Sequence, residues 1–407
     1  MSTYPADSRT VAAMEPMLPE QGIPKLDELS RSIFIEAGAL SAALPSEITR
    51  QAVARLVLEM NSYYSNLIEG HKTLPRDIER ALKEDYFPNQ EQRHNQQLTT
   101  AHIRVESEME RRLRDEPELN IHSADFLCWL HAAFYKNLPD ELHFSETKAG
   151  ERYRIEPGRL RSFNVDVGTH TPPDHRLLPA CLNRFARVYA DTSIPATRTL
   201  TAAAAAHHRL AWVHPFGDGN GRVARLYSHA ALIRQKVDGV GLWTLSRGLA
   251  RYRDRYYGCL AAADRPRHDD YDGRGNLSAR GLEDFCLFFL ETMLDQVRFM
   301  RELLELPKLL ARIEDYVHRE ATHITRHKER LFRLLKALLV EGKLERGQVP
   351  DIVGLKPSAA RQVTRLALGE GLLHSPSPKG HLCIAFPAKV LDAYFPRLFL
   401  DLPFGQA

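Results

Sequence analysis

Apolar residues recur along this chain mostly at helical spacing, and alternating, strand-like stretches are few and short. In the first half this pattern predicts helices over 26–40, 47–69, 75–84, 90–113 and 123–136. Further helices are predicted over 178–189, 199–212, 222–235 and 282–310. Between these two sets, residues 150–175 are rich in proline and glycine, which predicts short extended pieces joined by turns. The fold is therefore predicted to be mainly α, a helical bundle with short extended pieces between its two sets of helices.

From about residue 324 the predicted elements become short. Short helices are predicted over 331–339, 348–353 and 358–368, followed by a small hairpin from 372–373 and 382–385. Three short helices and a hairpin are typical of a winged helix-turn-helix. Lys356, Arg361 and Arg365 flank or lie on its candidate recognition helix, where they could contact DNA. A protein-interaction or dimerisation module with a solvated basic face is the alternative, and the sequence leaves both open.

Four segments follow from this pattern: a flexible N-terminus over 1–24, an N-terminal helical region over 25–120, a core over 121–310 and the winged helix over 324–407. The net charge of +3 excludes a generic polyanion binder, although local basic patches are compatible with it. Five cysteines, odd in number and far apart, fit neither a disulfide framework nor a paired metal knuckle. With no secretory pattern and no apolar run of membrane-spanning length, the chain is predicted to be cytoplasmic and free of membrane.

The most informative stretch is 214–225, which reads HPFGDGNGRVAR. Its three glycines let the backbone turn tightly and approach a ligand closely, and the loop leads directly into a predicted helix. The free N–H groups and the positive end of that helix make an anion site suited to phosphates. The glycines are Gly217, Gly219 and Gly221.

Charged side chains complete this site. Arg222 and Arg225 are three residues apart on one helix face, and two guanidinium groups beside an anion loop indicate a polyphosphate. Asp218 adds a negative charge that would be useful if it held a divalent cation bridging the phosphates. His214, at the mouth of the loop, has a suitable pKa to take a proton from an attacking hydroxyl.

The stretch resembles the signature of the Fic (filamentation induced by cAMP) family at every fixed position. The resemblance implies that His214 deprotonates a hydroxyl of a target protein and that Phe216 anchors the loop in the core. It implies further that Asp218 coordinates Mg2+ and that ATP is the substrate. The implied phosphate ligands are Gly219, Asn220 and Gly221 for the α- and β-phosphates, Arg222 for the β-phosphate and Arg225 for the γ-phosphate. Attack on the α-phosphorus would release diphosphate and leave AMP on the target.

One further segment and one tyrosine also resemble features of Fic proteins. Residues 158–173 resemble its β-hairpin flap, implying that a target protein is held there by strand addition. Tyr257 stands where relatives often place an aromatic ring against the nucleotide, although core packing explains Tyr256 and Tyr257 equally well. His207, His208 and His229 lie on helices without ligand partners at metal spacing, so they are read as structural or exposed histidines.

Ser65 and Glu69, on one helix face and followed by Gly70, form the second decisive motif. Beside the loop they resemble the family's inhibitory motif, located N-terminal to the core. The resemblance implies that Glu69 pairs with Arg225 and denies that arginine to the γ-phosphate. His71 departs from the asparagine that many relatives carry at the next position.

These observations predict a protein adenylyltransferase, inhibited by its own Glu69, with an attached winged helix. A transcriptional regulator whose Fic domain senses nucleotide is the alternative, as is a Fic enzyme that uses another donor, such as one transferring UMP, phosphate or phosphocholine. The target protein and its modified residue, the release from inhibition and a homodimer are left open.

Overall fold

The structure, a computed structural model, describes residues 10–20, 22–146, 150–168, 170–321, 324 and 326–400. The helices of the N-terminal part are α1 (Ile23–Ser41), α2 (Glu47–Ile68), α3 (Pro75–Leu82), α4 (Gln90–Asp115) and α5 (Ala124–Lys136). A two-stranded hairpin, β1 (Phe144–Glu146) and β2 (Arg152–Arg154), comes next. The middle part holds α6 (Leu178–Tyr189), α7 (Thr199–Val213), α8 (Asn220–Arg234), α9 (Leu245–Arg251), α10 (Arg253–Ala263), α11 (Ala279–Leu303) and α12 (Leu306–Asp315). The C-terminal part holds α13 (Lys328–Glu341), β3 (Lys343–Leu344), α14 (Val349–Val353), α15 (Pro357–Gly369), β4 (Leu373–His374), β5 (Leu382–Ile384) and α16 (Leu391–Tyr394).

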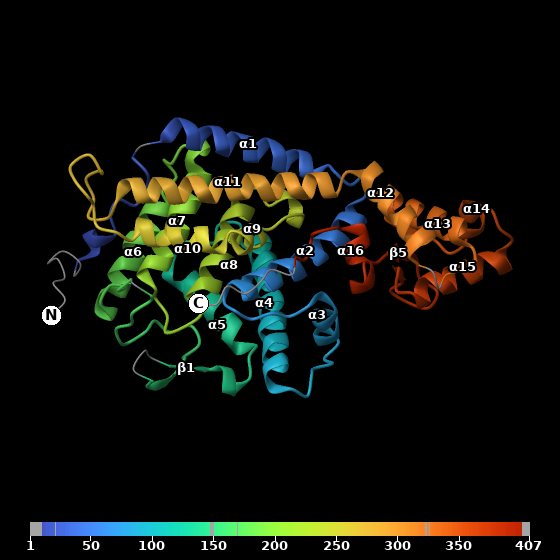
Figure 1. The fold of residues 1–407 in the computed structure, drawn as a ribbon, viewed down its shortest axis with the longest axis horizontal. Coiled ribbons are helices and arrows are strands. Elements are labelled where there is room, and N and C mark those ends of the chain that lie inside the picture. The colour runs from blue at the N-terminus through green and yellow to red at the C-terminus, as the bar shows by residue number, and fades with distance from the viewer. Residues whose placement is uncertain are drawn as a thin grey trace.

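The helical body is built around α7, whose residues are nearly all buried. The long helix α11 runs along one side of the body with α1 beside it, and α7 to α10 lie beneath them (Figure 1). The alanine run 202–206 carries small side chains, so α6, α8 and α11 can approach α7 closely. This packing fixes the junction between α7 and α8, where the glycine-rich loop lies.

The long helix predicted over 282–310 is in fact two helices. α11 ends at Leu303, and α12 begins at Leu306 with Pro307 in its first turn. Proline lacks the N–H that a continuing helix would use, so it is tolerated at a helix start and not in an interior. The apolar pattern alone runs through this break, and the prediction was wrong here.

Part of the segment predicted to be a flexible N-terminus packs on the body. Among the described residues 10–20, Met14 and Met17 are buried. The buried Arg209 of α7 donates two hydrogen bonds to the carbonyl oxygen of Pro16, at 2.7 and 3.1 Å. The prediction that these residues are flexible was therefore wrong. The contacts that hold them join segments almost two hundred residues apart, so they leave no local signal in the sequence.

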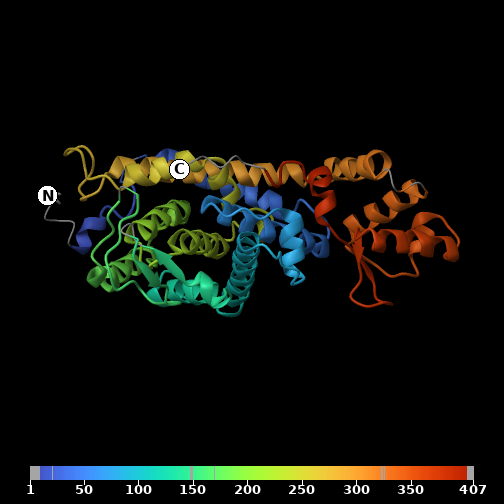
Figure 2. The ribbon, with the colours of Figure 1, turned by 60° about the horizontal axis from the view of Figure 1, so that its bottom comes forward.

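The C-terminal unit occupies one end of the molecule (Figure 2). Its order is α13, β3, α14, α15, β4, β5, and its three strands pair antiparallel in the order β3-β5-β4. The three helices and the β4–β5 hairpin agree with the sequence prediction, and β3 is an additional strand. The winged-helix assignment and the domain boundaries stay predictions.

After this unit the chain returns to the helical body. The hydroxyls of Tyr63 and Tyr64 on α2 donate to the carbonyl oxygens of Leu400 and Leu398, at 2.9 and 3.0 Å. The segment around residues 395–400 therefore packs against the same helix that carries Ser65. No helix in the described part of the chain is long and apolar enough to cross a bilayer. All five cysteines are free.

Candidate functional site

The glycine-rich loop connects α7 to α8 through two left-handed residues. His214 ends α7 with φ 47° and ψ 62°, and Gly219 precedes α8 with φ 77°. A side chain at position 219 would also meet the Tyr135 ring, because a Cβ built there lies 3.1 Å from it. The Asn220 side chain closes the loop, accepting from the Phe216 amide and donating to the Phe216 carbonyl, both at 2.9 Å. The amides at the start of α8 are thereby held in a fixed arrangement, as an anion site requires.

Phe216 anchors this loop as the resemblance implies. Its ring is fully buried and stacks on His131 of α5, with ring centroids 4.1 Å apart. His131 accepts a hydrogen bond from the Gly158 amide at 2.8 Å and, through its other nitrogen, contacts the Asp218 carbonyl oxygen at 3.2 Å. His131 thus ties the loop to the segment upstream of it.

Arg161 fixes the segment that passes the mouth of the loop. Its guanidinium donates to the carbonyl oxygens of His214, Phe163 and Pro173, at 2.9, 2.8 and 2.5 Å. The Arg161 amide also donates to the Pro215 carbonyl at 2.9 Å. The guanidinium thus bonds both to the loop, at His214, and to the extended segment, at Phe163 and Pro173. From the sequence this arginine has no assigned role, because a single arginine in an extended segment carries no local signal.

The environment of His214 keeps its imidazole neutral. Burial, followed by the charges of His170 and Arg161, lowers its pKa from 6.5 to about 4. A neutral imidazole at physiological pH is the form that accepts a proton. At the start of the loop, His214 is therefore held in the form that can accept a proton.

Arg222 and Asp218 face each other one turn apart. Their side chains approach to 3.7 Å, and the Arg222 guanidinium lies 4.7 Å from the Phe134 ring centroid. Arg222 is only 6% exposed, and its Nε and Nη1 make no hydrogen bond within the described residues. Asp218 accepts from the Tyr135 hydroxyl at 3.0 Å. Burial opposes the ionisation of Asp218, yet Arg222 holds its pKa below the ordinary value.

Arg225, in contrast, is held by α2 through its Nε and Nη2. It donates to the Ser65 hydroxyl and the Ser65 carbonyl, both at 2.9 Å, and to Glu69 Oε1 at 2.6 Å. We call this contact of Ser65, Glu69 and Arg225 the clasp. A Cβ at Gly221 would lie 2.3 Å from Glu69 Oε1, so the carboxylate reaches directly over the start of α8. Burial works against the charge on Glu69, but Arg225 and then Arg222 hold its pKa below the ordinary value.

The remaining predicted residues divide between the site and the core. Tyr257 is 42% exposed, and its hydroxyl lies 3.4 Å from the Ile68 carbonyl, beside the end of α2. Tyr256 is buried and bonds to His207 at 2.7 Å, so its role is packing. His208 is also buried, which confirms that these two histidines are structural. Gly70 follows the helix with φ 90°, a conformation that favours glycine.

The regular hairpin does not lie where the sequence predicted it. The paired strands are β1 and β2, whereas residues 158–173 carry a single bridge, between Val167 and His170, with residue 169 outside the described residues. Prolines at 172 and 173 have no N–H to donate, so a regular ladder cannot extend through this segment. The β1–β2 hairpin nevertheless faces the loop, because the Tyr153 hydroxyl donates to the Gly217 carbonyl at 2.8 Å.

Comparison with known proteins agrees with this geometry. Residues 121–232 match the model of the Fic/DOC family, a range that includes α5, the loop and most of α8. The chain contains a Fic domain. It is 26% identical over 276 residues to the protein adenylyltransferase Fic of Nematostella vectensis, covering 65% of this chain and 56% of that protein. It is 32% identical over 127 residues to the protein of the same name from Aedes aegypti, covering 31% of this chain and 24% of the relative.

Solved structures show the same fold around the Fic domain. A Fic family protein from Desulfovibrio desulfuricans covers 90% of this chain and 98% of its own, with a TM-score of 0.53 at 18% identity. Fic-1 from C. elegans covers 70% of this chain and 74% of its own, with a TM-score of 0.50 at 18% identity. The chain spans only about half or less of the length of the curated relatives above.

Proposed function

We propose that this protein transfers the AMP part of ATP to a hydroxyl side chain of another protein. The observation that carries the proposal is the pair of idle donors on Arg222, buried beside the loop amides and facing Asp218. Buried guanidinium N–H groups without partners are costly, so a site that leaves them idle is suited to an anionic ligand. The relatives named protein adenylyltransferase Fic support ATP as that ligand.

The residues present also fit Mg2+. Asp218 combines an ionised carboxylate with a side chain that is 43% exposed, beside the proposed phosphate position. Hard oxygen ligands of this kind, together with phosphate oxygens, are what Mg2+ prefers. Asp218 would hold the ion, which would neutralise charge on the phosphates when bound.

The chain's own groups account for the transfer. Neutral His214 takes the proton of the target hydroxyl, and the oxygen attacks the α-phosphorus of ATP. The bond between the α-phosphorus and the bridging oxygen breaks, and diphosphate leaves. We assign Arg222 and the amides of 219–221 to the negative charge on the phosphates. Tyr257 would lie against the nucleotide, and the segment 158–173 or the β1–β2 hairpin would hold the target backbone by strand addition.

The clasp is proposed to be inhibitory. Arg225 has three acceptors on α2, which occupy its Nε and Nη2, so these two nitrogens must leave Ser65 and Glu69 before they can bind a γ-phosphate. ATP bound to the clasped form lacks that contact, and its α-phosphorus is then not held in line with the hydroxyl.

The decisive experiment uses the Glu69→Gly variant, incubated in parallel with α-labelled and γ-labelled ATP and Mg2+. We expect strong labelling of protein from the α position only, and none in the Glu69→Gly/His214→Ala control. Label from the γ position would mean phosphate transfer, and label from UTP in place of ATP would mean another donor. A Glu69→Gly variant no more active than the parent would exclude the inhibitory role.

A second proposal concerns the C-terminal unit. Lys356, Arg361 and Arg365 are exposed on or beside α15, an arrangement that favours contact with phosphates. DNA binding that weakens on the Arg361→Glu/Arg365→Glu exchange would support a winged helix that contacts DNA. Equal binding by the variant would favour a protein-interaction module.

A further inference from the structure

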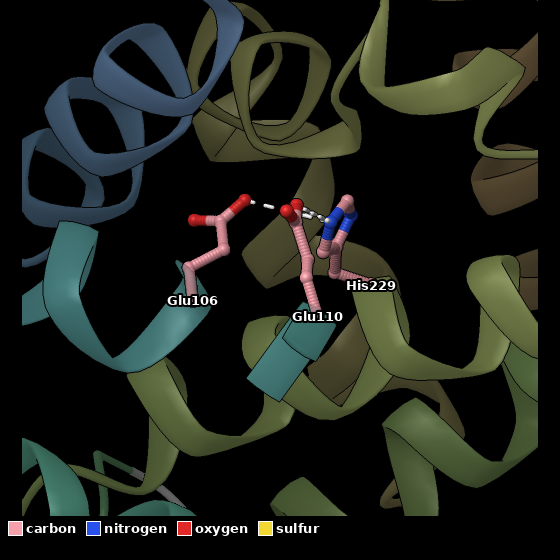
Figure 3. A group of neighbouring side chains, drawn as sticks. All are labelled: Glu106, Glu110 and His229. Atoms are coloured by element: carbon pink, nitrogen blue, oxygen red, sulfur yellow. Dashed lines mark hydrogen bonds and ion pairs between the residues drawn. The ribbon is translucent and has the colours of Figure 1, made fainter. Parts of the chain in front are cut away.

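One cluster of ligand-type side chains lies outside the proposed nucleotide site. Glu106 and Glu110 project from α4, one turn apart, toward His229 of α8 (Figure 3). One oxygen or nitrogen atom from each of the three lies within 4.8 Å of the others. From the sequence, His229 is read as structural or exposed because no ligand partner stands at metal spacing; its neighbours in the structure come from a helix more than one hundred residues earlier.

The distances in this cluster suit a metal ion. His229 Nε2 lies 3.2 Å from Glu110 Oε1 and 3.6 Å from Glu106 Oε1. Zinc-type ions bind nitrogen and oxygen at about 2.0–2.2 Å, so neighbouring ligand atoms in a tetrahedral site are about 3.3–3.6 Å apart. The two distances from His229 lie close to this range, and all three ligand atoms lie within 4.8 Å of one another.

The charge balance also favours a cation. Glu106 is 2% exposed, and Asp238 adds a third carboxylate that acts on both His229 and Glu110. The cluster thus places two carboxylates, one of them buried, against a single imidazole, and this set of oxygen and nitrogen atoms suits a divalent cation.

His102, one turn before Glu106 on α4, contacts the buried carboxylate from another side. Its side chain is fully buried, and its Nδ1 lies 3.3 Å from Glu106 Oε2, whereas His229 approaches Oε1. The Glu106 carboxylate is therefore oriented by a neighbour outside the cluster, as is common for a metal ligand.

We propose that Glu106, Glu110 and His229 bind a divalent transition-metal ion of the zinc type. Glu106 is held in place from behind, because Asn61 of α2 donates to its Oε2 at 2.7 Å and His102 approaches the same oxygen. This leaves Oε1 for the ion. Glu110, whose side chain is 35% exposed, opens the site to solvent and provides the path of entry. The ion would join α4 to α8, the helix that carries Arg222 and Arg225.

The test is a titration of the full-length, chelator-treated protein with Zn2+ alone, followed by Co2+ as a spectroscopic probe. We expect one ion per chain and a Co2+ absorption spectrum typical of tetrahedral coordination. Glu110→Gln should weaken Zn2+ binding by about 100-fold or more, since even outer contacts of a metal site are worth about 10- to 100-fold. His94→Gln is the matched control, because it removes another histidine–glutamate pair, with Glu141 at 2.7 Å, outside the cluster.

Uptake of less than one ion per parent chain would overturn the proposal without any variant. Equal affinity of Glu110→Gln and the parent would overturn it as well, leaving His229 as a simple ion-pair partner of Glu110. Because Glu110 is partly exposed, we expect Glu110→Gln to fold, and its thermal unfolding in chelator should show at most the small loss of stability due to the lost pair with His229.

Discussion

Ser65 offers a sharper test of the clasp than Glu69, because its removal should weaken the contact without abolishing it. In Ser65→Ala, Arg225 loses the hydroxyl that accepts from its Nε at 2.9 Å, but keeps the Ser65 carbonyl and Glu69. Both Ser65 and Arg225 are almost fully buried, at 0% and 4% exposure, so water does not replace the lost partner easily.

The size of the effect follows from this geometry. A hydrogen bond to a charged group contributes about 1.5–3 kcal/mol. The bond is present in the clasped form and absent once Arg225 turns to a γ-phosphate, so its loss shifts the equilibrium toward the active form by at most that amount. With about 1.4 kcal/mol for each factor of ten, the ceiling is about 10- to 100-fold in labelling rate.

The assay is the initial rate of self-labelling from α-labelled ATP, measured over a range of ATP concentrations. We expect the parent to be slowest, Ser65→Ala intermediate and Glu69→Gly fastest. The double variant should be no faster than Glu69→Gly, because both changes open one clasp and their effects do not add.

Ser62→Ala is the matched control for this series. Ser62 lies on the same helix, is equally buried and donates to the Thr99 carbonyl at 2.8 Å, with no contact to Arg225. It should lose stability without gaining activity. If Ser65→Ala stayed at the parental rate while Glu69→Gly was active, or if Ser62→Ala activated equally, the clasp would not be the source of inhibition.

Three further predictions follow from the site. In the Glu69→Gly background, labelling should stay nearly constant from pH 8 to 5.5, because His214 acts unprotonated and loses that form only as pH falls toward its pKa of about 4; a pH profile with a midpoint near 6.5 would contradict this. In the same background, Asp218→Asn should raise the Mg2+ concentration needed for half-maximal labelling by about tenfold or more, as expected for a lost charged ligand, whereas an unchanged Mg2+ dependence would remove Asp218 from that role. Arg161→Lys should lower the free energy of unfolding by about 1.5–3 kcal/mol, since lysine cannot reach three carbonyls at once; denaturant unfolding of the exposed Arg159→Lys control should match the parent.

Most helices were predictable because their apolar spacing is a local property of the sequence. The same holds for the loop at 214–225, where glycines, a helix start and two arginines occur within twelve residues. The break before Pro307 was predictable in principle but was missed, since the apolar pattern continues through it. The hairpin at 144–154 was misplaced because its strands are only three residues long, too short for alternation to be read.

By itself, then, the sequence determined the helical class of this protein and the position of its glycine-rich loop, and its resemblance to the Fic family implied the pairing between Glu69 and Arg225. Only the tertiary structure decided that Arg161 bonds to carbonyl groups on either side of the loop mouth, that residues 398–400 return to α2, and that His229 meets two glutamates. The physical reason is that helix periodicity and glycine turns depend on near neighbours. Contacts between distant segments depend on how whole helices pack, and that packing is set by the shapes of many buried side chains together.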